Sequence, residues 1–164
     1  MTIDEFWELI DEAHRRSKQC GGDPRDKAEW LVAELRKLPA KDGRDFDSHF
    51  QALYHRAYHW PLWAAAYIIQ GGCSDDGFMD FREALISLGR TRYESALADP
   101  ESLADLDEED YQALHVFTWG SFIGEAVDVP LNAPQPPHPK EPTGTNWDEK
   151  KVREMYPRLA ARFQ

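Results

Sequence analysis

The stretch WPLWAAAYIIQ, residues 60–70, decides the fold, because it is apolar on nearly every face of the helix that it predicts. A helix without a polar face is normally covered by other elements on all sides. The sequence therefore predicts a central helix with the rest of the chain packed around it. The stretch has only about half of the roughly 20 residues that cross a bilayer, so we expect no membrane span.

Amphipathic helices are predicted on both sides of this stretch. Apolar residues recur at spacings of three and four, and no segment alternates with the period of two that is typical of a strand. Thr2 with Glu5 has the pattern of a capping box, and Asp23 before Pro24 is a typical helix start. The predicted helices cover residues 3–18, 24–38, 43–58, 61–70, 75–88, 90–98 and 108–127. We therefore predict an all-α fold, a compact single-domain bundle of about six to eight helices.

The chain is predicted to have three parts. Residues 1–128 form the helical core domain, and residues 129–146 form a connector whose six prolines between residues 130 and 142 prevent helix or central strand. Residues 147–164 are predicted to form a C-terminal helix that starts at a cap-like pair, Asn146 and Glu149, and is kinked or restarted at Pro157. We expect this helix to dock on the core, because its large apolar side chains would otherwise remain in water.

The charge of the chain argues against several classes of partner. The 164 residues include 30 acidic and 19 basic ones, which gives a formal net charge of −11. Binding to duplex nucleic acid or to an anionic membrane needs clustered Lys and Arg, so we expect neither partner. Two cysteines make no disulfide framework, and the N-terminal pattern is that of an acidic amphipathic helix rather than a signal peptide. We expect a soluble cytoplasmic protein.

The most unusual segment is the glycine-rich turn GGCSDDG, residues 71–77. Glycine-rich turns that open a helix can hold phosphate on free backbone amides, but here Asp75 and Asp76 would repel an anion. The simplest interpretation is a tight turn in which Ser74 caps the next helix and the two aspartates occupy its first turn. The alternative is that Asp75 or Asp76 binds a cation, or holds Arg82 or Arg90 in a fixed pose.

Two arginines and two tryptophans complete the set of candidates. Arg82 and Arg90 lie beside the apolar stripe of the helix over residues 75–88 and at its end, so each is expected to form an internal ion pair or to receive a carboxylate from a ligand or partner. Trp60 and Trp63 are interpreted either as core or as the wall of a ligand pocket. The candidate ligand- or partner-binding residues are Trp60, Trp63, Ser74, Asp75, Asp76, Arg82 and Arg90.

Metal and cofactor sites are not predicted. His55 and His59 are four residues apart, as are Asp45 and His49, but neither pair supplies the three or four convergent ligands of a zinc site. The turn lacks the lysine of a P-loop and the third glycine of a dinucleotide fingerprint.

With these residues described, the chain resembles a bacterial family known as domain of unknown function 4240. The resemblance rests on Phe6-Trp7, on AYHWPLWAAAY (residues 57–67), on GGCSDDGF (residues 71–78), and on Phe81-Arg82, Leu85-Ile86, Gly89-Arg90 and DPESLA (residues 99–104). It covers about the first 105 residues, and it brings no substrate and no catalytic residue.

The function expected from these observations is that of a non-catalytic binding or regulatory module. The acids of residues 99–110 would steer a basic protein or peptide toward the surface around Trp60, Asp75, Asp76 and Arg82, unless this run is only a solvated connector. A small-molecule ligand remains open. The alternative function is a small enzyme that tailors a metabolite or peptide, with Asp75 or Asp76 as base and Arg82 or Arg90 orienting a carboxylate. A third interpretation is an oligomeric scaffold.

Overall fold

The N-terminal helix shows how local sequence signals set the elements. Thr2 caps α1 (Ile3–Gln19) by accepting a hydrogen bond from the Glu5 amide, and the Glu5 side chain accepts one from the Thr2 amide, so the predicted capping box is confirmed. Asp23 and Ser74 cap α2 and α5 as predicted. The structure is a computed structural model that describes residues 1–115, 119–127 and 136–164.

The described residues form helices and no named strand, which confirms the all-α prediction. After α1, the elements in chain order are α2 (Pro24–Leu35), α3 (Ala40–Arg56), α4 (Trp60–Gln70), α5 (Asp75–Ser87), α6 (Arg90–Ala98), the 3₁₀ helix η1 (Pro100–Asp105), α7 (Glu108–Ala113), α8 (Trp119–Val127), α9 (Val152–Met155) and α10 (Pro157–Arg162). Among these elements, no helix combines the length and the apolar character that crossing a lipid bilayer requires.

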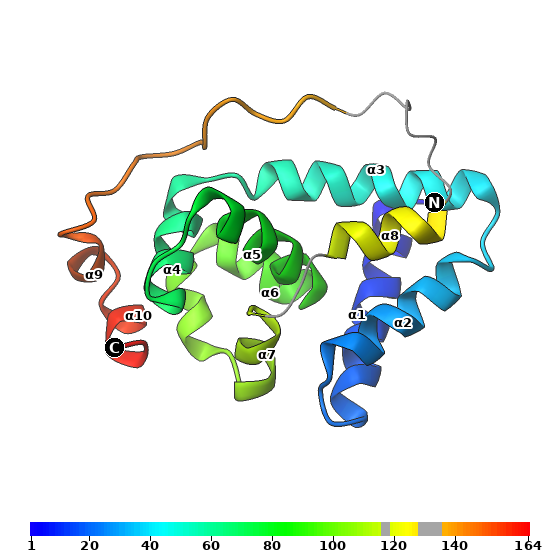
Figure 1. The fold of residues 1–164 in the computed structure, drawn as a ribbon, viewed down its shortest axis with the longest axis horizontal. Helices are drawn as coiled ribbons and strands as arrows, with labels where there is room; N and C mark the ends of the chain where they lie inside the picture. The colour runs from blue at the N-terminus through cyan, green and yellow to red at the C-terminus, as the bar shows by residue number, and fades with distance from the viewer. Residues whose placement is uncertain (116–118, 128–135) are drawn as a thin grey trace.

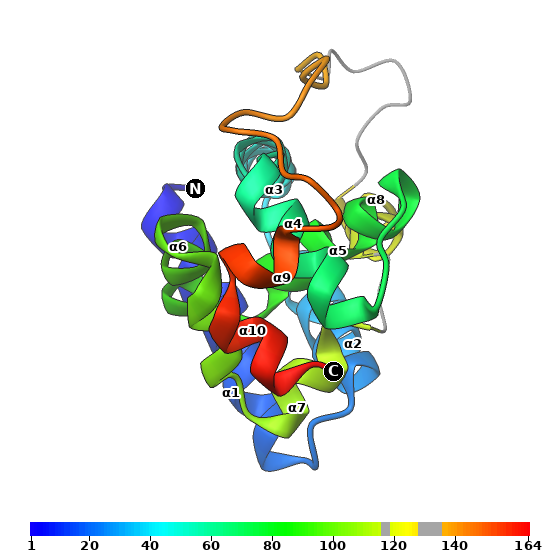
Figure 2. The same ribbon diagram turned by 90° about the vertical axis from the view of Figure 1, so that its left-hand side faces the viewer.

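Helix α3 runs along one side of the molecule and joins its two ends (Figure 1). At one end, α8 packs against α2 and α3, and α1 packs against α2. At the other end, α4, α5 and α6 lie together, and the C-terminal helices α9 and α10 lie against α4 and η1 (Figure 2).

The apolar helix α4 is largely enclosed, but the prediction that it is the central helix is wrong. It lies at one end of the molecule against α5, η1, α9 and α10, whereas α5 packs against α1, α3, α4, α6 and α8. Six of its eleven residues are buried, and Trp63 and Tyr67 are half-buried. The largest apolar side chains of the core come from α1, α3, α5 and α6 and include Phe6, Phe46, Phe50, Phe78, Phe81 and Tyr93.

The predicted single helix over residues 108–127 is wrong. Helix α7 ends at Ala113, and Leu114 and His115 form a turn; Phe117 and Thr118, which the prediction included, lie outside the described residues. The physical reason is that Asp110 of α7 is buried beside α1, whereas α8 packs on α2, α3 and α5. One straight helix of 20 residues, about 30 Å long, would not follow both surfaces.

The connector between α8 and α9 crosses the start of α4. The Trp60 amide donates to the Thr143 carbonyl (2.8 Å), and the Thr143 amide donates to the Tyr58 carbonyl (3.0 Å). Residues 128–135 of the predicted connector lie outside the described residues. The predicted helix start at Asn146 and Glu149 is wrong, because Asn146 bonds only to the next amide and helix begins at Val152. A new helix does start at Pro157.

Candidate functional site

An aromatic stack holds the glycine-rich turn against α4. The rings of Trp60 and Trp63 are 5.3 Å apart and nearly parallel, and Trp63 stacks in turn on Phe78 at 4.9 Å. The indole nitrogen of Trp63 donates to the Cys73 carbonyl (3.0 Å). Both tryptophans are half-buried. Their contacts therefore fix the turn before α5, which is a structural task.

The turn itself serves as a helix cap. The Ser74 hydroxyl accepts a hydrogen bond from the Gly77 amide (3.1 Å), and Asp75 and Asp76 are exposed in the first turn of α5. Within residues 1–115, 119–127 and 136–164, no three His, Cys, Asp or Glu side chains gather as a metal site would require. Burial raises the pKa of the Cys73 thiol to about 12, which leaves it a poor nucleophile near neutral pH.

Arg82 is fully buried, and carbonyl groups and aromatic rings hold its guanidinium. Nε donates to the Phe78 carbonyl (3.3 Å), Nη1 to the Tyr54 carbonyl (3.1 Å), and Nη2 to the Tyr54 hydroxyl (2.9 Å). The Cζ atom lies 3.9 Å from the centre of the Tyr54 ring and 4.6 Å from that of Tyr58. Burial lowers the pKa of Arg82. The expected ion pair is missing, because no carboxylate of the described chain is paired with Arg82.

The connector supplies a further neighbour of Arg82 that the sequence analysis missed. The Nε2 atom of His138 lies 3.5 Å from both Nη1 and Nη2 of Arg82. Its ring meets Tyr58 at 4.7 Å and His55 at 5.3 Å, both edge to face. Burial lowers the pKa of His55, and the charge of Arg82 adds to the effect. Nothing in the local sequence around His138 indicates this contact, which joins residues 56 positions apart.

Arg90 lies apart from the other candidates, at the opposite end of α5. Its Nη1 atom pairs with Asp4 (2.7 Å), and its backbone amide donates to Asp11 (2.9 Å). The 13 residues of α5, about 20 Å of helix, separate it from Asp75. The enzyme alternative needs an aspartate and an arginine that converge on one substrate. Asp75 and Asp76 are exposed, Arg82 is buried and Arg90 is distant, so the geometry does not favour this alternative.

The acidic run over residues 99–110 is used within the fold. Four of its seven acids bond to other parts of the described chain, namely Glu101, Asp105, Asp107 and Asp110, while Asp99 and Glu108 accept local hydrogen bonds from the Glu101 amide and the Gln112 side chain. Glu101 and Asp105 bind α10 through the Arg158 amide and side chain, while Asp107 and Asp110 bind α1 through Lys18. The run therefore links α1 and α10 to the core, and its exposed acids Asp99, Glu108 and Glu109 form no ion pair among the described residues.

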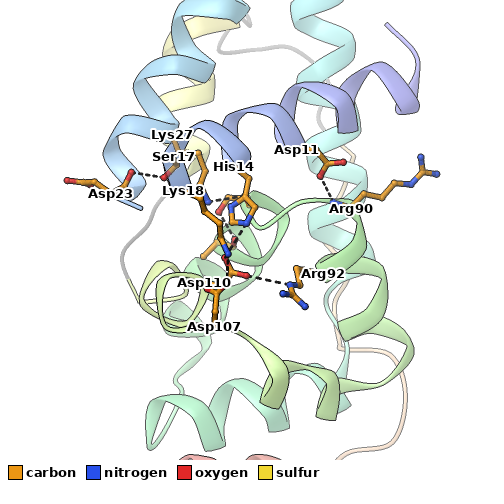
Figure 3. A network of polar contacts seen from close by, with 12 residues as sticks. Asp11, His14, Ser17, Lys18, Asp23, Lys27, Arg90, Arg92, Asp107 and Asp110 are labelled. Carbon is orange, nitrogen blue, oxygen red and sulfur yellow. Dashed lines mark hydrogen bonds and ion pairs between the residues drawn. The ribbon is translucent and has the colours of Figure 1, made fainter. Parts of the chain in front are cut away.

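Asp110 is the centre of a charged network (Figure 3). Its side chain is 1% exposed, and it lies 3.1 Å from His14 Nε2, 3.0 Å from Lys18 Nζ and 3.5 Å from Arg92 Nε. Burial raises the pKa of this carboxyl, but the contacts with His14 and Lys18 lower it more, to about 2. Sequence reasoning missed the network, because Asp110 is one acid among many in its run.

This network borders a cavity of about 380 Å³. One ring nitrogen of His14 faces Asp110, and the other is buried with no hydrogen-bond partner in the described structure. A general base needs a nitrogen within reach of the substrate, and His14 presents none. Nearby, Lys27 of α2 is also buried; it donates to the Ser87 carbonyl (3.1 Å), and burial lowers its pKa to about 8.

A groove of about 370 Å³ lies between α1, α2 and the start of α3. Its apolar side chains are Met1, Leu9, Trp30 and Leu38, and its carboxylates are Glu5, Glu8, Glu12 and Asp42. Arg16 of the chain itself lies at its edge, with Cζ 5.1 Å from the centre of the Trp30 ring and Nε bonded to Glu12 (2.6 Å). The groove thus combines an apolar wall with an acidic rim, an arrangement that the sequence analysis did not identify.

Comparison with known proteins identifies a family. A family model described as "Protein of unknown function (DUF4240)" matches residues 1–126, which include α1 to α7 and most of α8. No curated protein and no solved structure matches the chain. The matched range contains Arg82, the Asp110 network and the groove, and it covers well over half of the 164 residues. The chain belongs to the DUF4240 family.

Proposed function

We propose that this protein is a non-catalytic binding module of the bacterial cytoplasm that takes a basic segment of a partner protein into the groove between α1, α2 and α3. The observation that carries the proposal is the groove's composition, in which an apolar wall is bordered by four carboxylates. A partner segment with Lys or Arg next to a large apolar side chain matches both features.

The contacts of Arg16 support this choice of partner. Its guanidinium lies over the Trp30 ring and is bonded to Glu12, which is how a partner's arginine would be held. Glu8, on the same rim, is exposed. The net charge of −11 adds a long-range attraction for a basic segment and a repulsion for nucleic acid and anionic membranes.

The two other candidate surfaces are less suitable. Glu101, Asp105, Asp107 and Asp110 are bonded to α10 or α1, so a partner that took these acids would detach those helices from the core. In the groove, Glu5 and Glu12 are bonded, within the described chain, only to residues of α1 and its cap. The surface around Trp60 and Asp75 is occupied by the aromatic stack and the cap of α5. The groove brings four carboxylates and four large apolar side chains together in one hollow.

The experiment selects a random peptide library on the purified protein and measures the affinity of the selected peptides by fluorescence anisotropy. We expect peptides with Lys or Arg beside Trp, Phe or Leu, and binding that weakens as salt is added. Trp30→Ala should weaken binding by about tenfold or more, as loss of a central aromatic contact does. Glu8→Lys should also weaken it. Glu154→Lys, which makes the same change of charge on α9, should leave the affinity unchanged.

Selection of acidic peptides, or equal binding to Glu8→Lys and Glu154→Lys, would contradict the proposal. If no peptide is selected and the protein sediments well above its 18.9 kDa monomer mass, the groove is instead a contact between copies of the chain.

A further inference from the structure

Arg82 combines complete burial with the absence of a carboxylate partner in the described chain. A buried charge is normally paired, because leaving it uncompensated is expensive. Part of the explanation is structural. Tyr54 is in the last turn of α3, where carbonyls lack partners within the helix, and Arg82 caps that helix end. This capping role accounts for the hydrogen bonds to Tyr54 and Phe78. It does not account for the side of Nη1 and Nη2 that faces His138.

The other side of the guanidinium meets His138. Its Nε2 atom is 3.5 Å from both Nη atoms, and therefore lies symmetrically in front of the two nitrogens that grip a carboxylate in a bidentate pair. These distances exceed the usual 2.7–3.2 Å range of such hydrogen bonds. A single ring nitrogen thus stands where the two oxygens of a carboxylate would bind more strongly.

We propose that the Arg82 guanidinium is a binding site for the carboxylate of an aromatic acid, and that His138 occupies this site until the ligand replaces it. The aromatic character follows from the surroundings of the His138 ring, which lies 6.1 Å from the Tyr54 ring, 5.3 Å from His55 and 4.7 Å from Tyr58. A planar ring that enters in place of the imidazole would meet the same three rings while its carboxylate reaches both Nη atoms.

His138 is attached in a way that permits this exchange. The residue is exposed, and it lies between Pro137 and Pro139, which have no backbone N–H groups. The connector is held to the core through Thr143, five residues further on, so the imidazole can swing out while that bridge stays intact.

The test measures binding of benzoate and benzamide by isothermal titration calorimetry to the wild-type protein and to His138→Ala. Removal of the imidazole opens the site. His138→Ala should therefore bind benzoate about tenfold or more tightly than the wild type, because benzoate no longer has to displace the imidazole from the charged guanidinium. Benzamide has the same ring without the charge and should bind at least tenfold more weakly than benzoate. His115→Ala, which removes another exposed histidine, should bind benzoate as the wild type does.

Two further peptides identify the source of the carboxylate. A peptide that ends in a free C-terminal Phe is compared with the same peptide as its amide. If the free-acid peptide displaces benzoate, the ligand of the site is the C-terminal carboxylate of a protein or peptide. If benzoate binds and the peptide does not, the ligand is a small aromatic acid. Equal binding of acid and amide forms, or equal binding of benzoate by the wild type and His138→Ala, would overturn the proposal. Arg82 is left intact in all arms, since its substitution would also remove the cap of α3.

Discussion

Among the described glycines, Gly89 leaves the least room for a Cβ atom. Its φ is +95°, and a Cβ atom there would lie 2.3 Å from the Asp11 carboxylate, which accepts a hydrogen bond from the Arg90 amide. Gly89→Ala must therefore strain the backbone and displace Asp11. We expect a loss of about 2–4 kcal/mol in the free energy of unfolding, measured by urea denaturation.

Gly124 provides the matched control, because a Cβ atom there meets nothing within 4 Å in helix α8. Gly124→Ala should stabilise the protein by about 0.5–1 kcal/mol through higher helix propensity. If both alanine variants have the same stability, then the tight turn between α5 and α6 does not need a glycine.

Asp110 is the second residue with a large expected effect. Its carboxyl has a pKa of about 2, below the ordinary 3.8, so its ionised form stabilises the fold above about pH 4, and this stabilisation is lost as the pH falls toward 2. Asp110→Asn also leaves His14, Lys18 and Arg92 without their shared anion. The variant should lose about 2–4 kcal/mol at neutral pH.

Urea denaturation at several pH values checks this expectation. The difference between the wild type and Asp110→Asn should shrink as the pH falls from about 4 to about 2, because the wild type then loses the same charge. Asp76→Asn, at an exposed position, should change stability by less than about 0.5 kcal/mol. A difference that does not vary with pH would show that Asp110 acts by its shape rather than by its charge.

Residue by residue, the sequence predicted what is local and missed what is distant. The caps at Thr2, Asp23 and Ser74 were predictable, because each cap bonds to an amide two or three residues along the chain. The burial of Asp110 was not, because it depends on α1 side chains that are more than 90 residues away. The contact between His138 and Arg82 was not predictable either, because it joins residues that are 56 positions apart.

At the scale of elements, helices α2 and α5 meet through a buried lysine. Lys27 donates to the Ser87 carbonyl at the end of α5, and burial lowers its pKa from 10.5 to about 8. Between these two pH values the unfolded chain binds a proton that the folded chain has released, so stability from this group rises with pH. Below about pH 8 the full cost of burying the charge, about 3 kcal/mol, is present.

Lys27→Met removes this dependence and keeps the length of the side chain. The free energy of unfolding of the wild type minus that of the variant should therefore rise by about 2–3 kcal/mol from about pH 7 to about pH 10.5, measured by urea denaturation. Other titrating groups are common to both proteins and cancel in the difference. A constant difference would mean that Lys27 keeps its proton throughout this range, which would contradict the prediction.

Helical periodicity predicted the bounds of α5 and α6 well. Helix α5, predicted over residues 75–88, spans Asp75–Ser87, and α6 has the predicted bounds. Periodicity failed over residues 108–127, where apolar spacing continues through the turn at Leu114 and His115. A repeat of three and four gives the buried face of each segment, but it does not tell whether two segments face the same neighbour.

At the scale of the whole molecule, the question is whether the C-terminal segment unfolds together with the core. Leu159 of α10 is fully buried, and the Leu159 and Arg158 amides both donate to Glu101 of η1. Upstream, Tyr67 of α4 is bonded to Glu149 and its ring packs on Trp147 at 4.9 Å. These contacts extend from the connector to α10, so we expect one cooperative unit that includes the segment beyond residue 126, where the family match ends.

Leu159→Ala tests this expectation, because it creates a cavity between α10 and the core. In a single cooperative unit, the variant should lose about 2–4 kcal/mol of unfolding free energy, with an unchanged dependence on urea concentration. Met155→Ala, at a position that is 50% exposed, should lose less than about 0.5 kcal/mol. If Leu159→Ala instead frees the amides of α10 for hydrogen exchange while the core keeps its full stability, the C-terminal segment is a separate unit. Its detachment would then uncover α4 and the connector that carries His138, which would couple docking of α10 to access at Arg82.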